Sequence, residues 1–368
     1  MKLYEPYTFK NSGKQAINRI ALAPMTNLQS HADGTLSDDE YRWLVRRAKE
    51  GFGTIITCAA HVSLDGQGWE GELGIFDDKH IEGLTRLANG IREHKSLSIV
   101  QIFHGGARSP QSVIGQQPWS ASAHTMAISK TPVEVREGTI EEIENTIEAF
   151  VLAAERAYKA GFDGVELHGA HGYLLHQFMS TETNKRNDEW GGSFENRTKF
   201  TRTILQKIKA KLPAEFLVGV RISPEDKYTF KGIDFDESLQ FAKLLAEDGA
   251  DFIHISPWDA LKKPEKYLHL DKTMIEYFRA ALPADVAIMV AGEIWTGVDA
   301  EKAIQLGADF VALGKAAIGI PDFPTKAKDP NFIPQKPPYT IEHLQQADLG
   351  KEFIEYMKRW QGFVDGGK

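Results

Sequence analysis

The sequence predicts an α/β fold, a (β/α)8 TIM barrel with long active-site loops and a C-terminal helical extension. The first reason is a junction that occurs three times, as AGFDGVELH from Ala160, DGADFIHIS from Asp248 and LGADFVALG from Leu306. In each copy a glycine suited to a left-handed helix cap ends a helical pattern, and an apolar strand follows. EGFGTIITCAA from Glu50 is a looser copy. Such alternation indicates helices and strands arranged around a parallel sheet.

The second reason is the number of buried-looking strands, which is eight. The apolar runs lie at 20–23, 54–60, 97–103, 165–168, 216–223, 252–256, 287–291 and 310–313. Eight such units predict a closed barrel more readily than a doubly wound open sheet. A barrel of this kind typically takes about 250 residues, so a chain of 368 residues has room for long loops and a tail.

Helical patterns fill the intervals between these strands. SDDEYRWLVRRAKEG begins with Ser37 and Glu40 as a capping box, and its apolar residues then share one face. SFENRTKFTRTILQKIKAKLP carries apolar residues at spacings of four and ends at a proline. Two connections, 105–139 and 169–193, are too long for ordinary turns, and long loops in a compact domain are usually functional or disordered.

The C-terminal part of the chain predicts an addition to the barrel. After a proline-rich stretch through Pro338, the residues Leu349, Phe353, Tyr356 and Trp360 mark an amphipathic helix. We therefore expect a barrel over residues 1–335 and a helical tail over residues 336–368. The tail would pack on the barrel or on a neighbouring subunit of a homo-oligomer.

Composition and charge restrict the class of protein. A net charge of −8 with dispersed Lys and Arg predicts no nucleic-acid partner and no anionic membrane surface. The single cysteine, Cys58, excludes internal disulfides and four-cysteine metal sites and fits a reducing compartment. The N-terminus lacks the apolar region of a signal peptide, and no run approaches the ~18 apolar residues of a membrane helix. We expect a cytoplasmic protein.

Polar side chains collect at the predicted strand ends, where a parallel barrel places its active site. Gln101 lies in the third strand, His168 ends the fourth with His171 and Tyr173 just beyond it, and Arg221 lies in the fifth. A guanidinium inside a barrel needs an anionic partner. These residues predict one wall of a polar site.

Glycines mark the opposite wall of the same predicted mouth. The seventh strand ends in Ala291-Gly292-Glu293 and the eighth in Leu313-Gly314-Lys315. Backbone N–H groups beside such glycines can approach an anion, and Lys315 adds positive charge. A cofactor tethered by a phosphate, with its reactive ring over the barrel centre, would use both walls.

These residues also carry a resemblance to a known family. NRIALAPMT from Asn18, HGAHGYLLHQF from His168 and NKRNDEWGGSFENR from Asn184 resemble the old yellow enzyme family, whose members are FMN-dependent NAD(P)H oxidoreductases on a (β/α)8 barrel. The likeness runs from about Tyr4 to Pro321, with the motifs in register with all eight strands. The stretch DEWGGSFENR is highly specific.

The resemblance implies bound, non-covalent FMN, with NADH or NADPH as a transient hydride donor. It assigns the cofactor to Pro24, Met25, Thr26 and Ala59 at the flavin ring, Gln101 at the pyrimidine edge, Arg221 at N1 and O2, and Gly292, Gly314 and Lys315 at the phosphate. Relatives more often carry Arg where Lys315 stands. Arg binds phosphate in a bidentate fork, whereas Lys offers a point charge.

The resemblance also implies a reaction. His168 and His171 would hydrogen-bond the substrate oxygen, and Tyr173 would protonate the α carbon as general acid. Hydride would pass from NAD(P)H through flavin N5 to the β carbon of an α,β-unsaturated carbonyl compound. Nitro compounds and quinones are alternative small-molecule acceptors. Trp258 and Leu28 are expected to shape the substrate mouth.

Without the family resemblance, the residues are also compatible with other functional classes. The spacing H-x-x-H of His168 and His171 can chelate zinc, but no third ligand follows at a recognisable spacing, and we expect no metal. One alternative is a non-redox barrel enzyme, such as a metal-dependent hydrolase or a lyase. Another is a protein that binds FMN without turnover.

Overall fold

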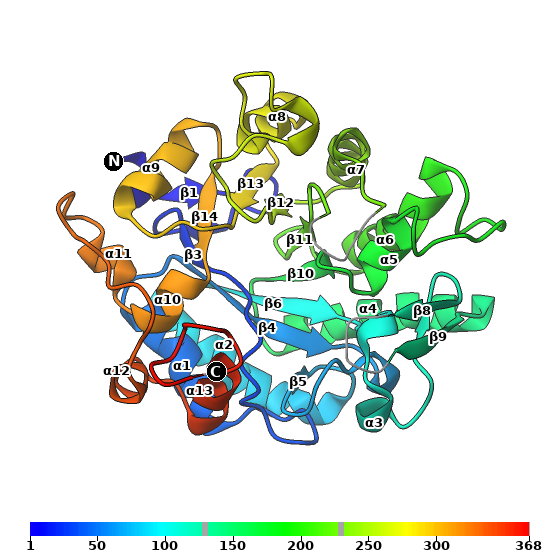
Figure 1. Ribbon diagram of the computed structural model, residues 1–368, viewed down its shortest axis with the longest axis horizontal. Coiled ribbons are helices and arrows are strands. Elements are labelled where there is room, and N and C mark those ends of the chain that lie inside the picture. The colour runs from blue at the N-terminus through cyan, green and yellow to red at the C-terminus, as the bar shows by residue number, and fades with distance from the viewer. Residues whose placement is uncertain (127–131, 227–231, 368) are drawn as a thin grey trace.

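A computed structural model of the chain describes residues 1–126, 132–226 and 232–367. Eight parallel strands close into a barrel, and helices surround it (Figure 1). The strands are β3 (Ile20–Leu22), β4 (Thr54–His61), β6 (Leu97–Phe103), β10 (Gly164–Gly169), β11 (Leu217–Ile222), β12 (Phe252–Ile255), β13 (Ala287–Val290) and β14 (Phe310–Leu313). The predicted barrel is confirmed, and each predicted strand lies within one residue of the observed bounds.

The barrel closes between its first and last strands. β14 pairs with β3 in parallel, with Val311 opposite Ile20, and β3 pairs in turn with β4. A short hairpin of β1 (Tyr7–Thr8) and β2 (Gln15–Ala16) precedes β3. From this hairpin Phe9 stacks on Phe310, with ring centroids 5.4 Å apart, and joins the core inside the barrel. Apolar side chains therefore fill the amino-terminal end of the barrel, and the other end is left for a site.

Helices cover the outside of the barrel and bury a second, larger apolar core against the strands. The main ones are α1 (Asp38–Lys49), α2 (Ile81–Arg92), α4 (Ile140–Lys159), α6 (Phe194–Lys211), α7 (Phe235–Glu247), α8 (Met274–Ala281), α9 (Gly297–Gln305) and α10 (Lys315–Gly319). The glycines at three predicted junctions have left-handed φ angles: Gly161 at +83°, Gly249 at +95° and Gly307 at +113°. This backbone is what a glycine cap after a helix requires.

The predicted capping box of α1 forms only in part. Ser37 accepts a hydrogen bond from the backbone N–H of Glu40, as an N-cap does. The carboxylate of Glu40 does not return the bond. It lies fully buried and accepts hydrogen bonds from Asn27 Nδ2 at 3.1 Å and Cys58 Sγ at 2.6 Å. The prediction was wrong for Glu40 because hydrogen-bond donors from other segments of the chain bind its carboxylate oxygens in the interior.

The long loops contain short elements that the apolar pattern did not reveal. The first holds η4 (Gly106–Arg108), α3 (Gln111–Ile114) and a three-stranded sheet of β7 (Trp119–Ser120), β8 (His124–Met126) and β9 (Val133–Glu137). The second holds α5 (Leu174–Met179). The remaining short elements are η1 (Lys2–Tyr4), η2 (Leu64–Gly66), β5 (Leu73–Gly74), η3 (Asp78–His80) and η5 (Glu265–Tyr267).

The C-terminal tail lies against the barrel beside α1 and α10 (Figure 1). It contains α12 (Ile341–Gln346) and α13 (Lys351–Met357), and the short helix α11 (Phe323–Lys326) precedes it. Phe353 packs edge-on against Trp43 of α1 with ring centroids 5.3 Å apart, and His343 Nε2 lies 2.7 Å from the carbonyl oxygen of Gly319. The division of the chain at residue 335 stays a prediction. Within the described ranges, no helix is both long enough and apolar enough to cross a membrane.

Candidate active site

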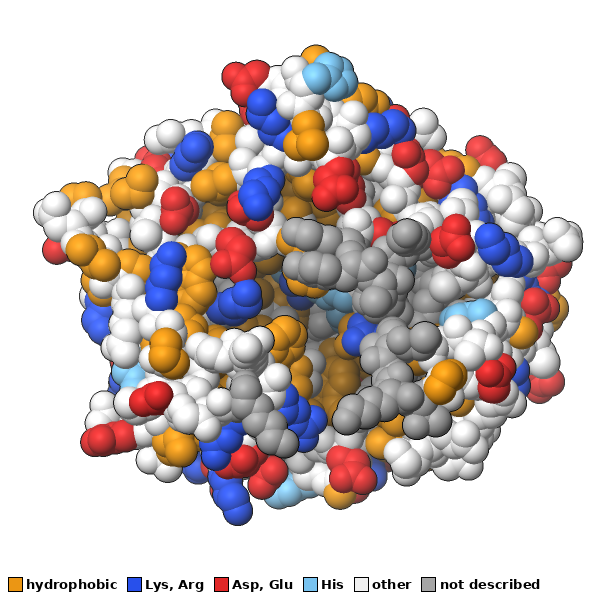
Figure 2. Space-filling model, in the orientation of Figure 1, with side chains coloured by type: hydrophobic (Ala, Val, Ile, Leu, Met, Phe, Trp, Pro, Cys, Tyr) orange, Lys and Arg blue, Asp and Glu red, His pale blue; other side chains and the backbone are white. Residues whose placement is uncertain are grey.

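A cavity of about 700 Å³ lies at the carboxyl ends of the barrel strands. Figure 2 shows a hollow near the middle of this face, with hydrophobic side chains inside it. The residues that the sequence assigned to catalysis and to the cofactor all line this cavity: Pro24, Met25, Thr26, Ala59, Gln101, His168, His171, Tyr173, Arg221, Gly292, Gly314 and Lys315. Residues that are up to 291 positions apart in the sequence, from Pro24 to Lys315, therefore meet at one end of the barrel.

His168 lies near the end of the strand β10, and His171 follows just beyond it. His168 is buried, and its ring lies 5.3 Å from that of His171 at an interplanar angle of 89°. The backbone N–H of Ala170 points at His168 Nδ1, 3.4 Å away. His171 has a left-handed φ of +58°, and its Nε2 lies 2.9 Å from Ser256 Oγ. The end of β10 and the turn after it therefore aim two imidazoles into one part of the cavity.

The electrostatic surroundings keep these imidazoles neutral. Burial, and then the positive charge of Arg221, hold the pKa of both His168 and His171 well below its usual value. A neutral imidazole carries one N–H donor and one bare nitrogen. Among the described residues, no three His, Cys, Asp or Glu side chains form a group that could hold a metal ion.

Tyr173 stands next to this pair. Its ring centroid lies 5.0 Å from that of His168 and 4.5 Å from that of Phe103. The guanidinium carbon of Arg108 lies 4.3 Å from the same centroid, and Arg108 Nη1 donates to the carbonyl oxygen of His171 at 2.6 Å. Burial raises the pKa of Tyr173. The phenol therefore stays protonated near pH 7 and can serve as an acid.

Arg221 extends from β11 with few partners. Its Nη2 donates to Ser256 Oγ at 3.0 Å, and its Nη1 points at the carbonyl oxygen of Pro24 at 3.5 Å. Its Nε is buried and has no hydrogen-bond partner among the described residues. Gln101 of β6 instead uses its amide Nε2 to donate to Glu166 Oε1 at 2.7 Å. An unpaired buried donor is costly, so this wall is incomplete without a ligand.

The glycine wall is shaped by close backbone contacts. A Cβ at Gly292 would lie 2.5 Å from the carbonyl oxygen of Pro257, and its φ of +141° also excludes most side chains. At Gly314 a Cβ would meet only Met25 Sδ within 4 Å among the described residues, at 3.5 Å. Space beside the backbone at Gly314 is therefore open to a group bound in the cavity.

Lys315 is already paired within the protein. Its Nζ donates to Glu293 Oε1 at 2.6 Å, and Trp295 Nε1 donates to the other oxygen at 3.0 Å. Burial would raise the pKa of Glu293, but these hydrogen bonds leave it lowered. The carboxylate of Glu293 would therefore compete with a bound anion for the positive charge of Lys315.

Several lining residues were missed from the sequence. Ser256 follows β12 and lay inside a predicted strand end, so the same signal could have found it. Tyr356, Met357 and Trp360 come from the tail, for which a strand-end argument offers no signal. Trp258 lines the cavity as expected and is half exposed, whereas Leu28 does not line it.

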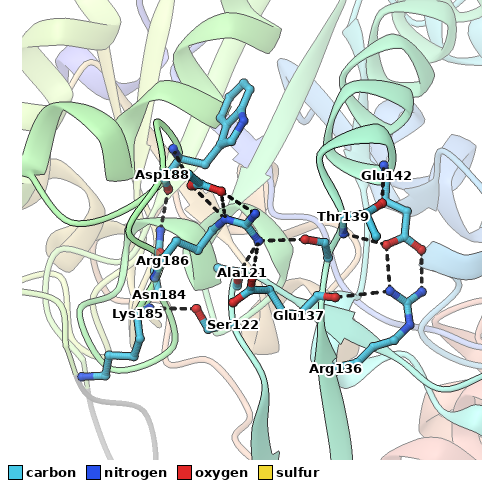
Figure 3. A network of polar contacts seen from close by, with 12 residues as sticks. Ala121, Ser122, Arg136, Glu137, Thr139, Glu142, Asn184, Lys185, Arg186 and Asp188 are labelled. Atoms are coloured by element: carbon cyan, nitrogen blue, oxygen red, sulfur yellow. Dashed lines mark hydrogen bonds and ion pairs between the residues drawn. The ribbon is translucent and has the colours of Figure 1, made fainter.

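The most specific motif lies outside the cavity. In NKRNDEWGG, Arg186 Nη1 donates to the carbonyl oxygens of Ala121 at 3.0 Å and Gly138 at 2.7 Å. Its Nε and Nη2 donate to Asp188 (Figure 3). We call these four residues the Arg186 clasp. It ties the loop after β6 to the loop after β10, the two loops that carry Arg108 and Tyr173, so the motif supports the site from outside.

The chain matches a family model described as the NADH:flavin oxidoreductase / NADH oxidase family over residues 2–331. It is 38% identical over 332 residues to the "Probable NADH-dependent flavin oxidoreductase YqiG" of Bacillus subtilis, covering 89% of this chain and 88% of that protein. It is 36% identical over 339 residues to an NADPH dehydrogenase of the same organism, covering 90% and 95% of the two chains.

A solved structure of the old yellow enzyme homologue from Zymomonas mobilis resembles the model with a TM-score of 0.81 and 26% identity, covering 94% of this chain and 96% of that one. Some relatives are much longer. The chain spans only 32% of an NADH:acrylate oxidoreductase of Vibrio harveyi, with which it is 37% identical over 86% of its own length.

Proposed function

The chain belongs to the NADH:flavin oxidoreductase / NADH oxidase family and is an FMN-dependent NAD(P)H oxidoreductase of the old yellow enzyme type, and from this premise we propose how its cavity works. The preferred acceptor is an α,β-unsaturated carbonyl compound, with His168, His171 and Tyr173 as the catalytic residues. One observation carries the proposal: two neutral imidazoles and a protonated phenol converge in the cavity that also holds Arg221.

The residues present fit FMN. Arg221 keeps a buried Nε with no hydrogen-bond partner in the part of the chain that the structure describes, which suits the electron-rich edge of a flavin. The backbone at Gly314 is open on the cavity side. When bound, FMN supplies the hydride chemistry, and the protein supplies orientation and electrostatics. We assign its binding to Pro24, Met25, Thr26 and Ala59 at the ring, Gln101 and Arg221 at the pyrimidine, and Gly292, Gly314 and Lys315 at the phosphate.

The side chains of the catalytic wall have complementary tasks. His168 and His171 each offer a neutral N–H donor to the same acceptor oxygen, and such donors act as an oxyanion hole when negative charge develops there. Tyr173 then gives its proton to the α carbon of the acceptor. Arg108 holds the carbonyl oxygen of His171 and the face of the Tyr173 ring together, so the donor pair and the acid keep a common geometry.

The choice of acceptor within this class is wider than enones. Nitro compounds and quinones also present oxygens to the histidine pair, and the acrylate named for the Vibrio harveyi relative places small enoates among the compounds to test. NADH and NADPH are both candidate donors, as the names of the two Bacillus subtilis relatives indicate. We further propose that the protein acts in the cytoplasm, which suits the buried free thiol of Cys58, and forms a homo-oligomer.

Tyr173→Phe tests the proposed acid. The change removes one hydroxyl and keeps the ring between Phe103 and Arg108, so packing is expected to survive. Stopped-flow absorbance of the bound flavin separates the two half-reactions. Reduction by NAD(P)H is expected near the wild-type rate, and reoxidation by an enone should slow by about 10²-fold, the usual scale for a positioned acid.

Other acceptors provide an internal control for the same variant. Quinones and nitro compounds need no protonation at carbon, so they should reoxidise the Tyr173→Phe protein at close to the wild-type rate. Equal slowing of the reductive and oxidative halves would show that Tyr173 positions ligands instead of donating a proton. A wild-type protein that is yellow but is not bleached by either nicotinamide under anaerobic conditions would favour FMN binding without turnover.

A further inference from the structure

Glu166 is a buried carboxylate one layer below the cavity. It lies two residues before His168 on β10, so both side chains point into the barrel, but Glu166 does not line the cavity. Its Oε1 accepts a hydrogen bond from Gln101 Nε2 at 2.7 Å, and its Oε2 accepts one from His254 Nδ1 at 2.7 Å. Glu166 and His254 are both 0% exposed. The catalytic scheme above makes no use of this charge.

An acceptor-only group determines how its neighbours turn. A carboxylate has no proton to donate, so Gln101 must present its amide nitrogen, and not its carbonyl oxygen, to Glu166. The carbonyl oxygen and the second N–H of Gln101 are then held in one arrangement at the cavity wall. A neutral glutamine at position 166 would bring its own amide hydrogens and would allow Gln101 to turn over. The carboxylate of Glu166 therefore selects one of the two possible orientations of the Gln101 amide at the cavity wall.

Glu166 also balances a charge. Among the described residues, Arg221 has no carboxylate within ion-pairing distance, yet its side chain is buried at the cavity wall. Burial lowers the pKa of Arg221, and the negative charge of Glu166 acts in the opposite direction. In the sheet register Arg221 stands opposite His254, the second donor to Glu166. The positive charge of Arg221 at the cavity and the negative charge of Glu166 beneath it thus form one buried cluster.

We propose that Glu166 is a positioning residue that orients Gln101 for the pyrimidine edge of the flavin and moderates the positive charge that Arg221 presents to it. The inference rests on the proposed assignment of Gln101 and Arg221 to the cofactor. It has two separable effects. The orientation of Gln101 strengthens FMN binding. The charge of Glu166 opposes the negative charge that the bound cofactor gains on reduction, and so it lowers the midpoint potential.

Two substitutions at Glu166 separate these effects. Glu166→Gln removes the charge and the fixed orientation together. The dissociation constant for FMN should rise by about tenfold, the scale of one lost hydrogen bond, and the midpoint potential should move upward. Glu166→Asp keeps the charge but is one methylene shorter, so the contact with Gln101 is lost. It should weaken FMN binding and leave the midpoint potential at the wild-type value.

Asp251→Asn is the matched control. Asp251 is a buried carboxylate directly before β12, at the other end of the barrel, where its Oδ2 accepts from Val218 N at 2.8 Å and Lys209 Nζ at 2.9 Å. This variant loses a buried charge without touching the cavity. Its FMN dissociation constant and midpoint potential should match those of the wild type, whatever happens to its thermal unfolding midpoint.

The measurements are fluorescence titration of the apo-proteins with FMN, and anaerobic redox titration of the loaded proteins against a reference dye. The inference is overturned if Glu166→Gln changes both quantities no more than Asp251→Asn does. A shift in potential for Glu166→Asp as large as for Glu166→Gln would refute the charge effect. If Glu166→Gln does not accumulate, wild-type FMN affinity in Glu166→Asp would refute the orientation effect. A wild-type protein that binds no FMN would refute the proposed function instead.

Discussion

Two buried arginines show how the scaffold and the cavity of this barrel differ. Arg186 and Arg221 are each 6% exposed. Arg186 meets two carbonyl oxygens and a carboxylate with bonds of 2.6 to 3.0 Å. Arg221 has one good partner, Ser256, one long contact of 3.5 Å to Pro24, and a buried Nε without a partner among the described residues.

The two arginines are therefore equally buried but differ in how many of their N–H groups have a hydrogen-bond partner. A guanidinium that meets all its acceptors within the protein stabilises the fold, because burying it unpaired would cost several kcal/mol. A guanidinium left partly unpaired is a place where the fold gives up stability that a ligand can restore. The number of hydrogen-bond partners of a buried polar group thus distinguishes residues that stabilise loops from residues that are available to bind a cofactor.

The largest expected effect comes from breaking the saturated arginine. Arg186→Met should lower the free energy of unfolding of the apo-protein by about 3 kcal/mol, because two carbonyl oxygens and Asp188 lose their hydrogen bonds from a charged donor. Chemical denaturation measures this change. Arg136→Met is the control. It breaks the pair between Glu142 and Arg136, a guanidinium more exposed than that of Arg186, and it should cost ~1 kcal/mol or less. Similar losses in both variants would mean that the clasp is no more than a surface contact.

The reverse pattern is expected for Arg221→Met. Its apo-protein should lose clearly less free energy of unfolding than Arg186→Met does, since Arg221 makes fewer hydrogen bonds within the protein. Its dissociation constant for FMN should rise by about 10²-fold, the scale for losing one partner of a buried charged contact. Fluorescence titration and denaturation together test the comparison. It fails if Arg221→Met destabilises the apo-protein as strongly as Arg186→Met does.

Lys315→Ala should have the smallest effect. Lys315 is largely exposed and shares its charge with Glu293, so its removal should weaken FMN binding by about tenfold or less at low ionic strength. The difference from the wild type should shrink between about 0.1 and 1 M salt, because exposed charges are screened. Glu293→Gln frees the lysine and should bind FMN at least as tightly as the wild type. Weaker binding by Glu293→Gln would place the phosphate elsewhere.

The sequence predicted the barrel and most of the cavity for a local reason. Glycine caps at Gly161, Gly249 and Gly307 mark where helices end. The continuous apolar runs that follow are typical of parallel strands that are buried on both faces. Because all strands point the same way, their last residues meet on one face. That rule alone collected both histidines, Gln101 and the glycine wall, without any knowledge of which strands are neighbours.

What escaped prediction depends on contacts between distant parts of the chain. The sheet of β7, β8 and β9 is built from strands of two to five residues, too short to show a period. Glu40 has the spacing of a capping box, yet donors from other segments turned its carboxylate inward. The tail residues Tyr356 and Trp360 reach the cavity through the packing of α13 on α1, which no pattern within the tail encodes.

The left-handed backbone of His171 limits how evolution or a library can alter the catalytic wall. A φ of +58° is strained for most L-residues by about 1–2 kcal/mol, and Asn, Asp and His are the non-glycine residues that tolerate it best. Of these three, Asp would bring an anion toward an acceptor oxygen. Asn is then the one exchange that keeps both an amide donor and a comfortable backbone. At position 171 the backbone conformation restricts the permitted amino acids before their catalytic chemistry is considered.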